Sequence, residues 1–356
     1  MKDIDPSSLA DSELMKRAGE ALGGDIISME RIGNGRNSRV YRAEVSDGRV
    51  VVLKHSVDES QEGLDRIATE HSSLRFLWDN GFRSIPRSLV VDVDQRISIH
   101  EYVEGSEIRG DSVTANEIDA AVNFIERLKS LAGRHDAKSL PPAAEACFSV
   151  RRLETVIRRR RDRLMSRHED LPEYKRLLDF IKSKFDPAFN DVTAWSISNL
   201  ERAGIVPDRI LPEKARTLSP SDFGFHNALR RSGDGGLVFL DFEYFGWDDP
   251  AKLVSDFLLH PAMSLADDLK KRFVDGAVVS LDCDDELPIR LKHVYPLYGL
   301  KWVMILLNEF VSEDLERRRF AARNVEDASA IRARQLMKAE RLLDAIVKDY
   351  RYFPYV

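Results

Sequence analysis

Three polar residues in the second half of this 356-residue chain have the types and spacing needed for metal-assisted chemistry on a hydroxyl group. Asp222 and Asn227 lie five positions apart, and Asp241 follows the apolar run 237–240. Asp222 can accept the proton of an incoming hydroxyl group and align that group. Asn227 and Asp241 offer oxygen ligands to Mg²⁺, which keeps some of its waters and takes other ligands from phosphate groups. The pattern predicts a catalytic base, Asp222, beside a magnesium site formed by Asn227 and Asp241.

A lysine and a glutamate earlier in the chain could complete such a site. Alternation of side chains places Lys54 on one face of the strand expected over 50–54. Glu70 falls among apolar residues on one face of the helix expected over 62–80, where an unpaired carboxylate would be costly. An ion pair between Lys54 and Glu70 would remove that cost and direct the lysine toward phosphate oxygens.

A glycine-rich segment precedes these two residues. Residues 33–40 read GNGRNSRV and lie between two strand-like runs. Gly33 and Gly35 match the first two glycines of a nucleotide-binding loop, and Ser38 stands at the third. Val40 occupies the valine position that follows. Taken alone, the segment fits an ordinary β-turn better, and only the neighbouring residues favour a phosphate loop.

The elements that must position these residues begin with an antiparallel sheet. Residues 26–56 are rich in β-branched side chains and interrupted by glycines, and Asp47-Gly48 between two such runs is typical of a β-hairpin. The helix over 62–80 follows. Two further strands are expected at 88–93 and 97–103.

The pattern changes after Gly105, where we place a domain boundary. From about residue 115 onward helical periodicity dominates, and helices are expected over 118–131, 150–166, 174–185, 267–280, 289–310 and 328–350. A hairpin over 227–243 interrupts the helices, and its flanks carry the predicted base and metal ligands. The sequence therefore predicts an α+β protein of two domains, 1–105 and 106–356.

With these elements in place, the chain from about Ile32 to about Pro261 resembles the aminoglycoside phosphotransferase and choline kinase-like small-molecule kinases, which share the protein-kinase fold. Residues 70–77 (EHSSLRFL) are similar to the family's Glu-bearing helix, and residues 100–105 (HEYVEG) look like its hinge. Residues 245–250 (FGWDDP) look like its Gly-Asp-Pro turn. The resemblance implies a bilobal fold, with an antiparallel-sheet N-lobe and a mostly helical C-lobe.

The resemblance also implies a reaction and its partners. The chain is expected to bind ATP, with GTP as the other option, together with Mg²⁺, and to phosphorylate a hydroxyl group of a small molecule. Backbone groups of Glu101 and Val103 would hold the adenine. Four residues that follow the metal motif could line the acceptor pocket: Glu243, Tyr244, Trp247 and His260. The two aromatic side chains among them could equally belong to the core.

Two positions depart from the family's pattern. The triplet Pro220-Ser221-Asp222 stands where the family commonly has His-Gly-Asp, and Leu253 stands where an acidic residue is often seen. Both departures concern the bracing of the loop and its packing. The four expected reacting or metal-binding positions are intact: Lys54, Asp222, Asn227 and Asp241. An active enzyme is favoured, and the alternative is a nucleotide-binding pseudokinase with a regulatory or scaffold role.

Charge bears on the choice of acceptor. The chain has 54 basic and 60 acidic residues, a net charge of −6. Residues 1–105 hold 14 Lys and Arg against 19 Asp and Glu, and the remainder holds 40 against 41. The second domain is thus nearly neutral, whereas an acidic groove would attract a polycationic antibiotic. A sugar, an amino alcohol or a related metabolite is favoured over an aminoglycoside.

Composition excludes several other classes of protein. An apolar fraction of 43% excludes intrinsic disorder, and the apolar run 302–307 is far shorter than the roughly 20 residues of a membrane span. The polar N-terminus 1–6 does not read as a secretion signal. Cys147 and Cys283 are expected to be reduced structural thiols. A cytoplasmic protein without a membrane partner is expected.

Nucleic acid binding is the third hypothesis. The arginine-dense stretch 151–163 spreads around a helix and is diluted by acidic residues, which favours a solvated surface. A nucleic-acid binder would instead show steeply salt-dependent association. We expect no nucleic-acid partner.

Overall fold

The computed structural model describes residues 6–33, 37–56, 60–167, 171–281, 285–321 and 326–355. The chain divides into two compact units. The first comprises Met1–Glu107, Ala228–Tyr244 and Glu316–Val325, and the second comprises Ile108–Asn227, Phe245–Leu315 and Glu326–Val356. The hairpin segment is thereby grouped with the N-terminal strands. The division into domains after residue 105 stays a prediction.

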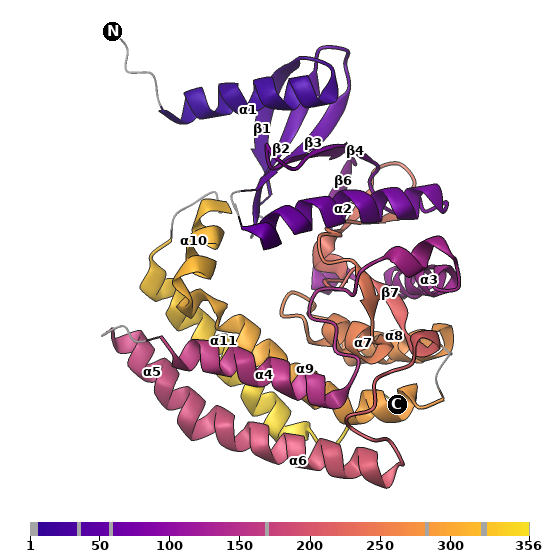
Figure 1. Cartoon of the computed structure of the whole chain (residues 1–356), viewed down its shortest axis with the longest axis vertical. Helices are drawn as coiled ribbons and strands as arrows, with labels where there is room; N and C mark the ends of the chain where they lie inside the picture. The colour runs from indigo at the N-terminus through magenta and orange to yellow at the C-terminus, as the bar shows by residue number, and fades with distance from the viewer. Residues whose placement is uncertain are drawn as a thin grey trace. The chain divides into compact units, whose positions relative to one another are not determined.

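In the first unit, five strands of the described chain form an antiparallel sheet in the order β1-β2-β3-β5-β4 (Figure 1). The strands are β1 (Ile26–Ile32), β2 (Ser38–Val45), β3 (Val50–Ser56), β4 (Ser88–Asp92) and β5 (Ile97–Glu101). The hairpin predicted at Asp47-Gly48 is confirmed, because β2 pairs with β3 across it. Gly48 has a φ of 88°, which glycine adopts without steric cost.

Helix α1 (Pro6–Leu22) packs against one face of this sheet (Figure 1). Its Leu14 and Ala18 share a core with alternate residues of the strands: Ile26, Tyr41, Ala43, Val45, Val51, Leu53, Ile97 and Ile99. Because successive strand side chains point to opposite faces, Lys54 projects from the face opposite to Leu53.

Helix α2 (Gln61–Asp79) begins at Ser60, whose hydroxyl accepts a hydrogen bond from Gly63 N at 3.2 Å. A second antiparallel sheet in the first unit has the order β6-β8-β9. Its strands are β6 (Gly105–Glu107), β8 (Ala228–Arg231) and β9 (Leu237–Phe239). Gly105 is required there, because a Cβ atom at this position would lie 2.6 Å from Arg230 O.

The second unit is mostly helical. Its helices are α3 (Ala115–Leu131), α4 (Val150–Met165), α5 (Pro172–Phe180), α6 (Asp186–Arg202), α7 (Pro250–Leu259), α8 (Asp267–Ser280), α9 (Leu287–Leu306) and α11 (Ala328–Asp349). A π-helical turn, η3 (Ile181–Phe185), joins α5 to α6, and α10 (Ser312–Ala321) contains residues of both units. Short 3-10 turns are η1 (Gly110–Ser112), η2 (Asp136–Ser139), η4 (Glu213–Ala215), η5 (Phe225–Asn227) and η6 (Asn308–Phe310).

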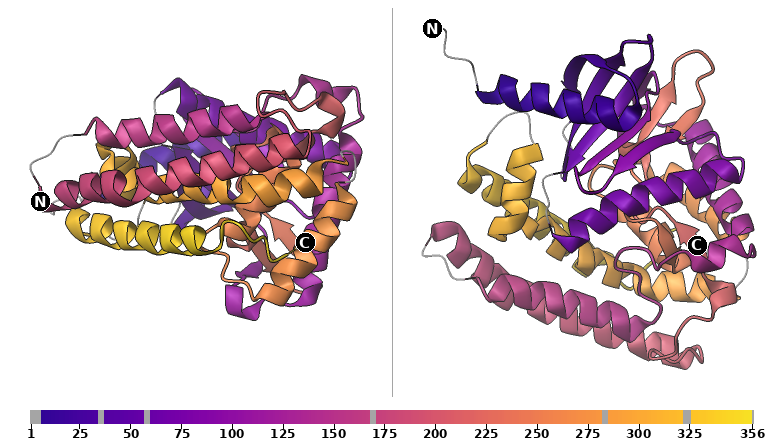
Figure 2. Two further views of the ribbon diagram at one scale, coloured as in Figure 1. Left: turned by 90° about the horizontal axis from the view of Figure 1, so that it is seen from below. Right: turned by 45° about the horizontal axis from the view of Figure 1, so that its top comes forward.

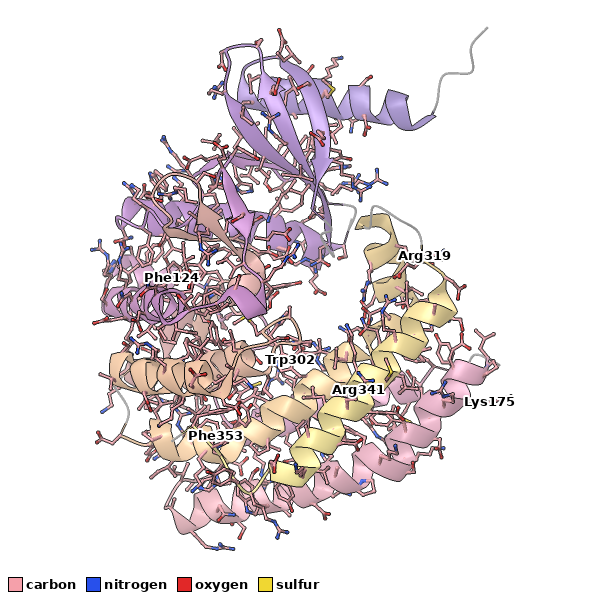
Figure 3. All side chains as sticks on the ribbon, turned by 180° about the vertical axis from the view of Figure 1, so that it is seen from behind. Phe124, Lys175, Trp302, Arg319, Arg341 and Phe353 are labelled. Atoms are coloured by element: carbon pink, nitrogen blue, oxygen red, sulfur yellow. The ribbon has the colours of Figure 1, made fainter. Side chains whose placement is uncertain are left out.

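Helix α9 is the centre of this helical unit. It contacts α4, α6, α7 and α11, and Figure 2 shows α4, α6 and α11 running beside one another. After α11 the chain returns to α9, where the ring of Phe353, labelled in Figure 3, lies 5.0 Å from that of Tyr295. No described helix combines the length and the apolar character that a bilayer span requires.

Two short strands position the loop that carries the predicted base. Strand β7 (Thr217–Ser219) pairs antiparallel with β10 (Gly246–Asp248). This pairing holds the end of β7, from which the chain continues to Asp222, beside the start of α7. At Gly246 a Cβ atom would lie 2.3 Å from Pro141 O, so only glycine fits this crossing.

Candidate active site

Lys54 and Glu70 form an ion pair in the first unit. Lys54 Nζ lies 2.5 Å from Glu70 Oε1 and 3.5 Å from Asp241 Oδ1. The register of the sheet places Lys54 opposite Val40 on β2, and Glu70 lies on the buried face of α2. Burial alone would lower the pKa of Lys54, but the charges of Glu70 and Asp241 raise it above its usual value. The side chain is therefore a firmly charged ammonium group held between two carboxylates.

Asp241 follows β9 in an unusual backbone conformation. Its φ is 65°, a left-handed value that non-glycine residues rarely adopt. Strain of this kind gathers at functional sites, where the surroundings hold it in place. The carboxylate remains 35% exposed, so it is accessible to a ligand.

Glu243 and Tyr244 share a partner that the sequence did not single out. Asn37 Nδ2 donates to Glu243 Oε1 at 2.6 Å and to Tyr244 Oη at 3.0 Å. Arg66 Nε lies 4.0 Å from Glu243 Oε2. Burial, together with the charge of Asp241, raises the pKa of Glu243 to about 7. The sequence analysis also did not single out Arg66. This residue lies on the buried face of α2, four residues before Glu70, and that position was a sequence signal that could have identified it as a site residue.

The remaining residues predicted to bind the nucleotide lie in the glycine-rich segment and in the 101–103 segment. Gly33 directly follows β1 and has a φ of 69°, and Ser38, the first residue of β2, pairs with Ser56. Gly35 lies outside the described residues. Glu101 and Val103 help to line a cavity of about 400 Å³. The other lining residues are Trp78, Arg83, Ile85, Tyr102, Glu104, Arg231 and Ser232.

In the second unit, Asp222 lies between β7 and η5. Asn227 Nδ2 donates to the backbone oxygen of Asp222 at 3.0 Å and approaches Asp222 Oδ2 at 3.4 Å. Since the amide nitrogen of Asn227 faces Asp222, its amide oxygen is the atom that could bind a cation. The structure thus brings the predicted base and one predicted metal ligand together.

Two histidines face the carboxylate of Asp222. His226 Nε2 lies 3.1 Å from Asp222 Oδ1, and His260 Nε2 lies 3.8 Å from the same oxygen. His260 Nδ1 accepts a hydrogen bond from Ala262 N at 3.2 Å, which places the proton of a neutral ring on Nε2. Both rings can therefore direct an N–H group toward Asp222. His226 had no assigned role in the sequence, although its position just before Asn227 was visible there.

The arrangement of the two rings decides what this cluster can do. One ligand atom each from Asp222, His226 and His260 lies within 4.8 Å of the others, which is close enough for a metal site. However, the two imidazoles are stacked, with centroids 3.6 Å apart and planes only 7° apart. Their in-plane lone pairs run parallel and do not converge on one ion. The cluster suits the orientation of a carboxylate better than the binding of a metal.

Packing around the stacked rings leaves little freedom. A Cβ atom at Gly224 would lie 2.7 Å from His226 Nδ1, so the ring occupies the space beside this glycine. The ring of His260 meets Trp302 of α9 edge to face at 4.9 Å, and Figure 3 labels Trp302. The histidine pair is consequently held from both sides.

Trp247 has a different environment from the other expected acceptor residues. Its indole Nε1 donates to Ala137 O at 3.0 Å, and its backbone forms a bridge with Pro142. These contacts give it a packing role at β10. His260 lies beside Asp222, whereas Glu243 and Tyr244 lie with Asn37 in the first unit.

The arginine-dense stretch is largely neutralised by acidic neighbours. Side-chain ion pairs join Arg151 and Arg158 to Glu154, Arg159 and Arg160 to Glu145, Arg161 to Asp186, and Arg163 to Asp314. These carboxylates compete with any phosphate backbone for the same guanidinium groups. The absence of a nucleic-acid partner stays a prediction.

Comparisons with known proteins agree with this geometry. Residues 28–252, more than half of the chain, match the sequence model of the phosphotransferase enzyme family, APH. No curated protein matches the chain significantly in sequence.

Several solved structures share the fold. A spectinomycin phosphotransferase, APH(9)-Ia, in complex with ADP and spectinomycin is 12% identical, with 94% of this chain and 98% of that chain covered and a TM-score of 0.62. Choline kinase LicA from Streptococcus pneumoniae is 14% identical, with coverage of 94% and 99% and a TM-score of 0.60. Plasmodium vivax ethanolamine kinase is 14% identical, with coverage of 95% and 95% and a TM-score of 0.60. The predicted protein-kinase-like fold is confirmed, and the chain is a phosphotransferase that belongs to the phosphotransferase enzyme family.

Proposed function

We propose that the protein transfers the γ-phosphoryl group of ATP to a hydroxyl group of a small molecule. The observation that carries this proposal is the ammonium group of Lys54, held 2.5 Å from Glu70 and 3.5 Å from Asp241. A cation fixed in this way can bind phosphate oxygens at little further cost in side-chain entropy. ATP is the favoured donor and GTP the alternative.

The residues available for a metal fit Mg²⁺. Asp241 supplies a partly exposed carboxylate, and Asn227 supplies an amide oxygen, both of which are hard donors. A bound Mg²⁺ would neutralise charge on the transferred phosphoryl group. The ammonium group of Lys54 would bind phosphate oxygens in addition to the metal.

Asp222 is proposed as the base that aligns the acceptor. Asn227 donates to its backbone oxygen, and His226 donates to one carboxylate oxygen. These donors hold the carboxylate in one orientation, so it can accept the acceptor's proton as the hydroxyl attacks. Catalysis would come mainly from positioning and charge neutralisation.

The acceptor is proposed to be a sugar, an amino alcohol or a related metabolite. Spectinomycin, choline and ethanolamine, which are named with the similar structures, all carry hydroxyl groups. The near-neutral charge of residues 106–356 favours the smaller molecules over a polycationic antibiotic. His260, beside Asp222, is the proposed acceptor contact in the second unit.

A screen tests this function directly. The protein is incubated with Mg²⁺, γ-labelled ATP and fractionated metabolite extracts, and labelled products are identified. We expect one class of labelled product, lowered at least about 100-fold by Asp222→Asn. Full activity in that variant would remove Asp222 as the base.

The altered triplet Pro220-Ser221-Asp222 is the reason to test a second function, that of a nucleotide-binding pseudokinase. A pseudokinase would bind Mg-ATP and be stabilised by it in a thermal-shift assay. It would not show even slow intrinsic hydrolysis of ATP, and it would label no acceptor. Binding without turnover across a broad panel of hydroxyl compounds would favour that regulatory role.

A further inference from the structure

Ser221, the residue immediately before Asp222, has a strained backbone. Its φ is 69°, in the left-handed region that side chains with a Cβ rarely adopt. In the described part of the chain this conformation is shared by few non-glycine residues: Arg96, Glu145, Ser221 and Asp241. Glycine would take this conformation at Ser221 without strain. Something in the surrounding structure must therefore hold the serine in place.

The hydroxyl group of Ser221 shows what holds it. Ser221 Oγ accepts a hydrogen bond from Lys252 Nζ at 2.9 Å and donates one to Ala144 O at 3.2 Å. The backbone N–H of Ser221 donates to Ser219 Oγ at 2.9 Å. Both the side chain and the backbone of this residue are thus fixed from outside the loop.

Lys252 is a buried cation with two acidic neighbours. It is 1% exposed, its Nζ donates to Asp248 Oδ2 at 2.7 Å, and it lies 3.3 Å from Asp256 Oδ2. Asp248 ends β10, and Lys252 and Asp256 lie on α7, so the spacing of four residues brings the three side chains to one side of this segment. A buried ammonium group keeps such a position only when paired, so its direction toward Ser221 is strongly determined.

The acidic neighbours are themselves fixed by α9. Asp256 accepts hydrogen bonds from Trp302 Nε1 at 2.8 Å and from Lys301 Nζ at 3.3 Å. Trp302 also packs on His260, which faces Asp222. The network that begins at Lys252 therefore reaches the predicted base along two routes, through Ser221 and through His260.

On the basis of the proposed phosphotransferase function, we propose that Lys252 and Ser221 are positioning residues for Asp222. Lys252 holds the left-handed backbone at Ser221, and that backbone sets the direction in which the next side chain leaves the chain. The carboxylate of Asp222 is thereby aimed at the acceptor hydroxyl. Neither residue touches the reacting atoms.

Two substitutions at one position separate positioning from simple structural support. Ser221→Ala removes the hydroxyl and keeps the strain, whereas Ser221→Gly removes both. We expect Ser221→Gly to be the more stable variant in thermal unfolding. Both variants should nevertheless lose kcat by roughly 10- to 100-fold, with KM for ATP unchanged.

A merely structural role predicts a different pattern. Activity would then follow stability, and Ser221→Gly would retain the wild-type kcat. That result would overturn the proposal. Arg96→Gly is the matched control, because it relieves the same backbone strain at a turn between β4 and β5 and should leave kcat unchanged.

A second measurement does not depend on turnover. Lys252→Met alone leaves Asp248 and Asp256 with an unbalanced charge, so Lys252→Met is combined with Asp248→Asn. Amide hydrogen exchange of residues 221–227 should become faster in this double variant and stay unchanged in Arg96→Gly. Unchanged exchange in the double variant would contradict the proposal. If the wild-type protein shows no phosphotransfer, the proposed function fails, and the exchange data still decide whether Lys252 holds the loop.

Discussion

His226 is the residue whose contribution can be separated most cleanly by substitution. Its Nε2 atom, 3.1 Å from Asp222 Oδ1, is the donor that orients the carboxylate. The amide nitrogen of glutamine reaches about where Nε2 lies, whereas that of asparagine reaches only about as far as Nδ1. We therefore expect His226→Gln to keep most of the wild-type kcat and His226→Asn to lose roughly tenfold.

Steady-state kinetics with the identified acceptor would check this expectation. The two variants lose the same stacking on His260, so a difference between them reports the hydrogen bond alone. Equal losses in both variants would assign His226 to packing.

His100 makes the stability of the protein depend on pH. Burial, followed by the charge of Lys54, lowers the pKa of this histidine to about 3. The unfolded chain has a histidine pKa of about 6.5, so between these values the unfolded state binds more protons than the folded one. The contribution of His100 to the free energy of unfolding is therefore fully present above about pH 6.5, and it is lost progressively as the pH decreases toward 3. At pH 5 the loss from this group approaches about 2 kcal/mol.

Urea unfolding at pH 7.5 and pH 5 would measure this effect. The variant His100→Gln cannot titrate, so its stability should fall less between the two values than that of the wild type. His135→Gln, at an exposed position, serves as the matched control and should behave like the wild type. A wild-type slope in His100→Gln would show that other groups control the acid response.

Among the described glycines, Gly246, where β10 crosses the 141–143 segment, has the least room for a side chain. A Cβ atom at Gly246 would lie 2.3 Å from Pro141 O, a backbone atom that cannot move without displacing β7 and β10. We expect Gly246→Ala to destabilise the protein by roughly 3 kcal/mol or more. Gly133→Ala, with nothing within 4 Å of the added atom, should leave the unfolding free energy within about 0.5 kcal/mol of the wild type. Equal stability of the two variants would show that the crossing adapts.

The elements of the first unit could be predicted because their signals are local. Alternation of apolar residues in β2 and β3 and the Asp47-Gly48 turn specify a hairpin without reference to the rest of the chain. The pairing of Lys54 with Glu70 followed from the cost of a carboxylate on an apolar helix face.

In the second unit, helix α6 was not among the expected helices. The π-helical turn η3 continues the helical structure past Phe185, and the periodicity of the apolar residues changes at this turn.

The rest of the site depends on contacts between distant parts of the sequence. Asn37 and Glu243 are separated by 206 residues, and no local pattern predicts their hydrogen bond. The stacking of His226 on His260 likewise requires α7 to be in place. The left-handed backbone at Ser221 also could not be predicted, because the lysine that holds it, Lys252, lies 31 residues away in the sequence.

For the molecule as a whole, ligand binding should appear as a change in stability. A ligand that binds only the folded state stabilises it by about 2.7 kcal/mol at 100 times its Kd. We expect Mg-ATP to raise the melting temperature by several degrees in the wild type and in Asp222→Asn, but not in Lys54→Met. Addition of EDTA should reduce the shift. Stabilisation of Lys54→Met equal to that of the wild type would remove Lys54 from the nucleotide site.

The path of the chain through the first unit limits where the protein can be divided. Strand β8 pairs with β6 on one side and β9 on the other, although 120 residues separate Glu107 from Ala228. A fragment that begins at residue 108 would keep β8 and β9 and lose β6, which leaves the amide and carbonyl groups of β8 unpaired along one edge. Such an edge recruits other strands and promotes aggregation. Each unit is built from three separate segments of the chain, so neither corresponds to one continuous fragment that a single truncation could yield.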